Sequence, residues 1–230
     1  MSPTTHRGSY KSKMVRVKIC GITNIKDAIA AVQADADALG FVFAESPRMV
    51  EVSTVSAILH HLPPFVTTIG VFAGMDANDI AEIMETTGLH FAQLHGPQAE
   101  SLLDRPRRWG IIRAIRVRSP QDIEREMCDR VVLASNAVLL DSYVEGKMGG
   151  TGQQFDWQLA LDWKALATRP CGLGEKPLIL AGGLTPENVV EAIRKVRPYA
   201  VDVSTGVEIY PGKKDHQKVK EFIRNAKRTI

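Results

Sequence analysis

The chain has 230 residues, of which 44% are hydrophobic and 24% charged. This is enough apolar material for one large globular domain and too much for a disordered or fibrous chain. The formal net charge is only +3, and because basic residues are scattered among acidic ones, the composition does not predict a nucleic-acid-binding protein. No apolar run is long enough to cross a bilayer, so we expect no membrane association.

The three cysteines, Cys20, Cys128 and Cys171, are widely spaced and contain no C-x-x-C pair. They predict neither a disulfide framework nor a zinc site, and a reducing cytoplasm is the expected compartment. Residues 1–13 lack the apolar core of a signal peptide and are predicted to be a flexible tail. Residues 14–230 are predicted to form one domain.

Eight short apolar runs alternate with segments of helical periodicity. The predicted strands are 15–21, 38–43, 67–72, 90–94, 111–117, 137–140, 177–181 and 200–204. The predicted helices are 25–33 after a Thr23 cap, Ser53 to about His61, 76–86, a short one from Pro97, 120–127, one from Asp156, one opened by Thr185 and Pro186, and 215–227.

This alternation predicts a parallel sheet, and eight units in a chain of this size predict a single (β/α)₈ barrel, the TIM barrel. The rival architecture is an open doubly wound sheet. It is disfavoured because the first turn, residues 20–23, lacks the glycine fingerprint of a dinucleotide site.

Apolar and polar residues alternate along the first strand, so Arg16, Lys18 and Cys20 share one face. Cys20 ends the strand, where parallel α/β folds place catalytic groups. Lone cysteines are mostly inert core residues, and that reading stays open here. If Cys20 reacts, a neighbouring cation would favour its thiolate, and Lys18 is the first candidate.

Asp141 ends the sixth predicted strand and is expected across the barrel mouth from Cys20. A thiol and a carboxyl facing one pocket suggest paired proton transfers, although a helix cap is the alternative for Asp141. The loop that follows contains Gly149, Gly150, Thr151 and Gly152, which suit a hinged lid. It is not a nucleotide-binding loop, because the Gly-Lys-Ser/Thr ending is missing.

A phosphate site is predicted after the seventh and eighth strands, where barrels of this kind usually hold one. Gly182 and Gly183 precede a helix and let backbone N–H groups approach an anion. Ser204, Thr205 and Gly206 offer further N–H groups, two hydroxyls and the start of a short extra helix.

Four further side chains are candidates for substrate binding. Arg48 follows the second strand, where it either clamps a carboxylate or is solvated. Gln93 and His95 share a face at the end of the fourth strand, although His95 could equally be structural. Asp202, on the strand beside Lys18 in a closed barrel, either pairs with Lys18 or binds a sugar hydroxyl. The histidines lack ligand partners at metal spacing, so no metal is predicted.

Ten short motifs, taken together and in order, resemble the phosphoribosylanthranilate isomerase family from Met14 to the C-terminus. They are VKICGIT (17–23), GFVF (40–43), SPR (46–48), GVF (70–72), QLHG (93–96), LD (140–141), GGTG (149–152), FDW (155–157), AGGL (181–184) and VDVSTGVE (201–208). The tail before Met14 departs from the pattern but contains none of the motifs.

The resemblance implies an Amadori rearrangement of N-(5-phosphoribosyl)anthranilate in tryptophan biosynthesis, with Asp141 as general acid and Cys20 as general base. It implies that Arg48 holds the anthranilate carboxylate and Asp202 a ribose hydroxyl. The phosphoribosyl substrate would be the partner, with no metal or organic cofactor, and the enzyme would be a cytoplasmic monomer or homodimer.

Three alternatives remain open. A histidine-pathway or bifunctional aminoaldose isomerase would resemble doubled half-barrels with an aspartate in place of Cys20, and residues 73–75 are no convincing copy of a second phosphate loop. Indole-3-glycerol-phosphate synthase would need lysine and glutamate catalysts that do not fall at these strand ends. A non-catalytic phospholigand-binding barrel would be favoured by loss of Cys20 or Asp141, and both are present.

Overall fold

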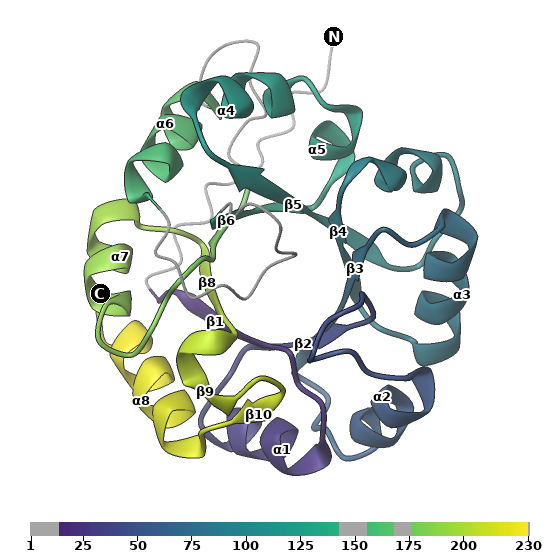
Figure 1. Ribbon diagram of the computed structural model, residues 1–230, viewed down its shortest axis with the longest axis vertical. Helices are drawn as coiled ribbons and strands as arrows, with labels where there is room; N and C mark the ends of the chain where they lie inside the picture. Colours follow the sequence, from purple (N-terminus) through teal and green to yellow (C-terminus); the bar gives the residue numbers. More distant parts are fainter. Residues whose placement is uncertain (1–13, 143–155, 168–175, 230) are drawn as a thin grey trace, which may run out of the picture.

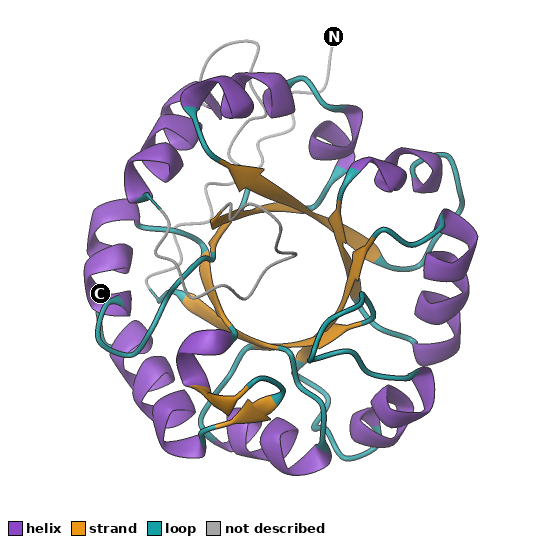
Figure 2. Ribbon diagram, viewed as in Figure 1, coloured by secondary structure: helices purple, strands orange, loops and turns teal. Residues whose placement is uncertain are grey.

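The computed structural model describes residues 14–142, 156–167 and 176–229. Eight parallel strands close into a barrel in sequence order, with helices around the outside (Figures 1 and 2). The strands are β1 (Arg16–Cys20), β2 (Ala38–Val42), β3 (Thr67–Ala73), β4 (Phe91–His95), β5 (Gly110–Val117), β6 (Ala137–Ser142), β7 (Leu178–Leu180) and β8 (Ala200–Val203). The predicted TIM barrel is confirmed.

Each strand is followed by at least one helical segment. The α-helices are α1 (Ile25–Gln33), α2 (Val52–Leu59), α3 (Ala77–Thr87), α4 (Pro120–Met127), α5 (Arg130–Ala134), α6 (Trp157–Ala167), α7 (Val189–Val196) and α8 (His216–Lys227). Two short 3₁₀ helices, η1 (Pro97–Leu102) and η2 (Thr205–Val207), follow β4 and β8, and a small hairpin of β9 (Glu208–Tyr210) and β10 (Lys213–Lys214) precedes α8.

Two apolar clusters divide the strand side chains by face. The larger cluster contains strand residues such as Ile19 and Leu140 together with helix residues such as Phe222, so it lies between barrel and helices. The smaller, strand-based cluster, which includes Leu139 and Ile179, fills the barrel interior. Side chains alternate along a strand, and this alternation decides which polar residues point inward.

Three details of the predicted elements are wrong. Helix α1 is capped by Asn24, whose Oδ1 accepts from the Asp27 N–H, and not by Thr23. Helix α2 begins at Val52 after Glu51, so Ser53 lies inside it. Helix α7 begins only at Val189, because residues 185–188 form a turn in which the Asn188 side chain accepts from the Thr185 N–H.

The β9–β10 hairpin and α5 are not among the predicted elements. The hairpin packs against the loops after β1 and β2. Thr23 donates its hydroxyl to the Gly212 carbonyl at 2.6 Å, and a Cβ on Gly212 would lie 3.0 Å from the Pro47 carbonyl oxygen. Gly212 also has φ of +85°, so it suits its place in this tight turn.

No helix in the described part of the chain is long and apolar enough to span a membrane.

Candidate active site

Cys20 and Asp141 both lie on the inner face of the barrel at the carboxyl ends of their strands. Ile19 and Leu140 belong to the outer cluster, so the residue after each turns inward. β1 and β6 are well separated around the barrel (Figure 1). The two predicted reactive groups therefore face the same barrel mouth from different sides.

Lys18 is buried in the barrel interior, two residues before Cys20 and on the same face of β1. Its Nζ donates to Asp202 Oδ2 at 3.0 Å and to Gln93 Oε1 at 2.9 Å. Burial alone lowers the pKa of Lys18, but Asp202 and then Cys20 raise it above its ordinary value. Lys18 is therefore a protonated cation that bridges β8, β1 and β4 beneath the reactive sulfur.

The Cys20 side chain is buried beside this ammonium group. Burial raises the pKa of the thiol, while the Lys18 and Lys214 ammonium groups oppose that rise. Gly40 on β2 leaves the room required, because a Cβ there would lie 2.9 Å from Cys20 Sγ and 3.0 Å from Lys18 Cε. The neighbouring cation predicted for Cys20 is thus present as Lys18. A second cation, Lys214, was not predicted from the sequence.

Asp202 and Ser204 leave polar atoms at the end of β8. Asp202 pairs with Lys18 through Oδ2, which was one of its two expected roles. Its Oδ1 and the Ser204 Oγ are buried and have no hydrogen-bond partner among the described residues. Buried polar atoms rarely stay unpaired, so both are free to meet a ligand.

Gln93 links Lys18 to His95. The Gln93 amide lies 3.0 Å from His95 Nε2, so the amide N–H donates and the imidazole Nε2 accepts. Burial, reinforced by Arg116 and Lys18, lowers the pKa of His95 to about 3. His95 is therefore a neutral imidazole whose proton sits on Nδ1, an atom without a partner in the described residues.

His95 also lines a cavity of about 330 Å³ at the carboxyl ends of β3, β4 and β5. Arg113 and Arg116 contribute to its wall, and Arg113 donates to the Gly96 carbonyl. His95 thus lines a cavity at the carboxyl ends of the strands, and its contact with the substrate stays a prediction.

Arg48 is buried and paired, so the alternative of a solvated arginine does not match the structure. Its Nε and Nη2 donate to the two Glu208 carboxylate oxygens at 2.9 and 2.7 Å, and Nη2 also lies 3.2 Å from the Thr205 hydroxyl. Arg48 and Lys214 lower the pKa of Glu208 although burial raises it. The Arg48 Nη1 makes no hydrogen bond to the described residues and remains for a ligand.

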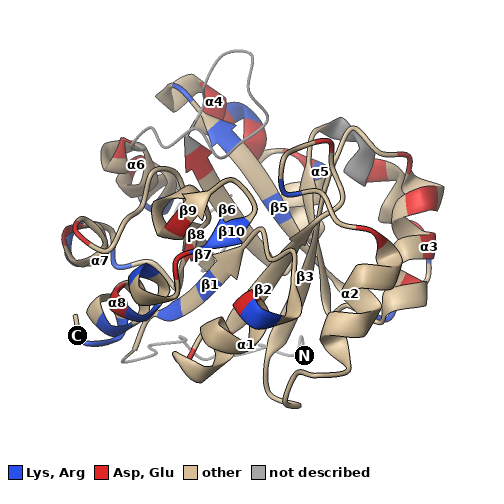
Figure 3. Ribbon diagram, turned by 60° about the horizontal axis from the view of Figure 1, so that its bottom comes forward, with Lys and Arg blue, Asp and Glu red and all other residues tan. Residues whose placement is uncertain are grey.

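Lys214 completes this group from the β9–β10 hairpin. Its Nζ donates to Glu208 Oε1 at 2.8 Å and lies 3.3 Å from the Ser204 carbonyl. In Figure 3 the basic segments of β1 and β10 lie close to acidic segments of β8 and β9. Sequence reasoning missed Lys214 because two-residue strands carry no periodic signal.

The two predicted phosphate loops lie side by side. Gly182 and Gly183 follow β7 with φ of +87° and +63°, a conformation that favours glycine. Gly206 is the middle residue of η2, and a Cβ there would collide with the Leu184 carbonyl. The Thr205 hydroxyl, on the loop after β8, accepts from Arg48 Nη2 at 3.2 Å.

Gly149, Gly150, Thr151 and Gly152 lie outside the described residues. Within the described residues no group of three or more His, Cys, Asp and Glu side chains could hold a metal ion.

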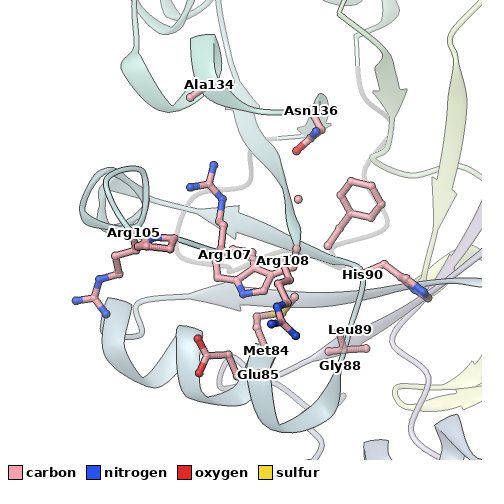
Figure 4. A pocket seen from close by; sticks show the side chains of 14 residues that line it. Met84, Glu85, Gly88, Leu89, His90, Arg105, Arg107, Arg108, Ala134 and Asn136 are labelled. Carbon is pink, nitrogen blue, oxygen red and sulfur yellow. The ribbon is translucent and has the colours of Figure 1, made fainter.

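A second, larger cavity of about 1340 Å³ lies at the opposite side, where β4 and β5 begin. Arg105, Arg107 and Arg108 line it, but in Figure 4 their side chains point in different directions. Arg107 Nη1 donates to the Leu102 and Leu103 carbonyls. The larger cavity therefore lacks converging groups, and the mouth at the carboxyl ends is the candidate active site.

The chain matches the family model described as N-(5'-phosphoribosyl)anthranilate (PRA) isomerase over residues 17–225. The N-(5'-phosphoribosyl)anthranilate isomerase of Pseudomonas fluorescens is 52% identical over 213 residues, which are 91% of this chain and 97% of the relative. The enzyme of the same name from a Geobacter species is 44% identical over 216 residues, 94% of this chain and 99% of the relative.

Solved structures agree with this match. The phosphoribosyl anthranilate isomerase of Thermotoga maritima has a TM-score of 0.78 at 41% identity, covering 93% of this chain and 99% of that one. A phosphoribosyl anthranilate isomerase in complex with reduced 1-(o-carboxyphenylamino)-1-deoxyribulose 5-phosphate has a TM-score of 0.77 at 40% identity, with the same coverage.

Proposed function

Because the chain belongs to the N-(5'-phosphoribosyl)anthranilate isomerase family, we propose that Asp141 and Cys20 carry the proton transfers of that reaction. The activity is the Amadori rearrangement of N-(5-phosphoribosyl)anthranilate to 1-(2-carboxyphenylamino)-1-deoxyribulose 5-phosphate in tryptophan biosynthesis. The observation that carries the assignment of roles is the inward turn of both side chains at the same barrel mouth.

The first step opens the ribose ring. Asp141 in its protonated form donates to the ring oxygen, the C1–O bond breaks, and the anthranilate nitrogen supplies the electron pair that forms an iminium at C1. Asp141 is left as a carboxylate. A positioned general acid of this kind is typically worth about 10² to 10⁴ in rate.

The second step moves the proton from C2. Cys20 as thiolate takes the C2 proton, the C–H electron pair forms a C1–C2 double bond, and the iminium becomes a neutral enolamine. In the tautomerisation that follows, the C2 hydroxyl loses its proton as the C2=O bond forms, and C1 gains a proton as the C1–C2 double bond becomes single, which gives the ketone at C2. Lys18 beside the sulfur stabilises the thiolate that this step consumes.

Three sets of groups hold the substrate. Arg48 receives the anthranilate carboxylate through Nη1, while Glu208 holds the rest of the guanidinium. Asp202 Oδ1 accepts from a ribose hydroxyl, and Gln93 and His95 line the wall opposite. The phosphate binds backbone N–H groups of the Gly182, Gly183, Ser204, Thr205 and Gly206 loops.

The surroundings of the reaction complete the proposal. No metal or organic cofactor takes part, since ring opening and C2 deprotonation need only an acid and a base. We place the enzyme in the cytoplasm, where reducing conditions keep Cys20 as a thiol. It acts as a monomer or homodimer on a small molecule, with no membrane or nucleic-acid partner.

Substitution of the two reactive groups tests these roles. We expect Cys20→Ala and Asp141→Asn each to lower kcat by at least about 10²-fold, while a product analogue still binds nearly as well as to the parent enzyme. Cys128→Ala, at an exposed cysteine, is the matched control and should change neither value. Robust turnover by either active-site variant would refute that residue's role.

A further inference from the structure

Five ionised side chains are concentrated around the ends of β1 and β8, and we call them the mouth cluster: Lys18, Arg48, Asp202, Glu208 and Lys214. Three ion pairs join them into two groups, and Glu208 is shared by two of the pairs. Lys18 pairs with Asp202 at 3.0 Å, and Glu208 pairs with Arg48 at 2.7 Å and with Lys214 at 2.8 Å. Each charged group is thus held in place by an opposite charge.

The mouth cluster is withdrawn from solvent. The side chains of Lys18 and Lys214 are 3% and 0% exposed, and that of Glu208 is 3% exposed. Interactions between charges at such depth are weakly screened by salt and water. A net charge in this cluster therefore acts strongly on any neighbouring titratable group.

The mouth cluster holds three basic groups and only two carboxylates. Burial lowers the pKa of Lys214, and the Glu208 carboxylate opposes that fall and favours the ammonium form. The next acid along, Asp27, does not offset the excess, because it binds the Lys213 ammonium at 2.6 Å and meets Lys214 only through the Lys214 backbone N–H. His95 adds nothing, since it is neutral. The mouth cluster therefore has an excess of one positive charge, and Cys20 is the ionisable acid beside the cluster.

Lys214 reaches this position from outside the barrel. Its ammonium group lies against the Ser204 carbonyl at the end of β8. Ser204 Oγ and the Arg48 side chain both lie against Gly21, the residue after Cys20, since a Cβ on Gly21 would contact both. Lys214 therefore lies near the carboxyl end of β1, where Cys20 carries the proposed reactive sulfur.

Resting on the proposed role of Cys20, we propose that Lys214 is a positioning residue for the isomerisation, whose buried ammonium supplies the positive charge that the Cys20 thiolate balances. Burial raises the pKa of the Cys20 thiol and the two lysines oppose that rise; when the thiol releases its proton to solvent, Cys20 and the mouth cluster together become neutral. The groups that face Cys20 are Lys18 on β1, Asp202 on β8 and Lys214 on β10. Of these, the two lysines stabilise the thiolate and Asp202 opposes it.

Alkylation of Cys20 by iodoacetamide, followed across pH without substrate and read on the Cys20 peptide, measures the thiolate directly. We expect Lys214→Met to slow alkylation at neutral pH roughly tenfold, the effect of losing one nearby opposite charge, and to move the midpoint to higher pH. Lys220→Met is the control. Lys220 is an exposed lysine on α8 outside the mouth cluster, and its substitution should leave the profile unchanged.

Substitution of a carboxylate of the mouth cluster should act in the opposite direction. Glu208→Gln raises the net positive charge, so we expect the alkylation midpoint to move to lower pH. The double variant Lys214→Met/Glu208→Gln restores the excess of one cation and should return the midpoint close to that of the parent. A purely structural role for Lys214 predicts no such reversal.

The proposal is overturned if Lys214→Met keeps the parent midpoint, or if only the alkylation rate at the high-pH plateau changes. If Lys214→Met does not fold, Glu208→Gln and the double variant decide, and an unchanged or raised midpoint in Glu208→Gln overturns it. Failure of the proposed function is separate, because it would show as turnover by Cys20→Ala whatever the alkylation profile.

Discussion

At the scale of single residues, Lys18 shows which contacts strand alternation can predict and which depend on pairing between distant parts of the chain. The alternation of β1 places Lys18 on the face of Cys20, and the sequence alone therefore predicts them as neighbours. Its pairing with Asp202 joins residues 184 positions apart. That pair could be named as one of two options only because a closed barrel puts β8 beside β1.

Arg48 shows where such reasoning stops. Its place after β2 is visible in the sequence, but its partner Glu208 lies 160 residues away in a segment outside the eight barrel strands. No periodicity links a loop to a hairpin. The pairing could be found only in the structure, and it excludes the solvated alternative, because the guanidinium is buried and held by Glu208.

Arg48→Ala is expected to raise KM for the substrate roughly 10- to 100-fold, because it removes a charge-assisted hydrogen bond to the anthranilate carboxylate. The fall in kcat should be smaller, since neither reactive group is touched. Steady-state kinetics checks both values. Glu208→Gln is the comparison, because it loosens Arg48 without removing it, and a smaller rise in KM is expected. An unchanged KM in Arg48→Ala would remove Arg48 from the carboxylate site.

At the scale of elements, the long helices and barrel strands were predictable and the β9–β10 hairpin was not. Helix α8 buries Val219, Phe222, Ile223 and Ala226, the spacing of an amphipathic helix. The hairpin instead has strands of three and two residues, and Ile209 and Tyr210 on it are exposed. The hairpin is held by its turn geometry and by contacts to α1, and neither produces an apolar periodicity in the sequence.

Asp27 of α1 is the contact that fixes the hairpin. Its side chain is fully buried and binds the Lys213 ammonium, the Lys214 N–H and His216. Burial works against ionisation, but these partners lower the pKa of Asp27 to about 2 from an ordinary 3.8. The ionised carboxylate therefore stabilises the folded protein above the ordinary pKa, and this stability is lost as pH falls toward 2.

We expect Asp27→Asn to lower the free energy of unfolding by about 2 kcal/mol at neutral pH. The difference from the parent should shrink between about pH 4 and pH 2, where the parent carboxylate becomes protonated. Urea unfolding at a series of pH values measures this. The control is Asp35→Asn, at a surface carboxylate whose side chain is 80% exposed, and it should change little. A pH-independent deficit in Asp27→Asn would contradict the linkage.

At the scale of the whole molecule, the fold follows from the repeated strand–helix unit, and the candidate site follows from the closure of the barrel. Eight strand–helix units predict a barrel without any knowledge of individual contacts. Closure then brings β1 beside β8, where Arg16 and Val17 pair with Ala200 and Val201. The loops after β7 and β8, which we propose for phosphate, and the thiol at the end of β1 become neighbours only through this pairing, so the proposed site exists only in the closed barrel.

The closing ladder gives a prediction about the start of the domain. The predicted domain begins at Met14, and the family match begins at residue 17. A chain that starts at Met14 keeps all of β1 and both of its pairings. We therefore expect removal of residues 1–13 to leave kcat/KM and the thermal unfolding midpoint unchanged.

A chain that starts with Met followed by Lys18 is the comparison. It loses Arg16 and Val17 from the β1–β8 ladder, and Val17 is fully buried in the outer core. Burial of a valine side chain is worth about 1.5 to 3 kcal/mol, before the lost ladder hydrogen bonds are counted. This chain should unfold at a clearly lower temperature and lose activity with the geometry of Lys18 and Cys20. Equal stability of the two chains, or loss of activity on removal of residues 1–13 alone, would show that the domain does not begin at Met14.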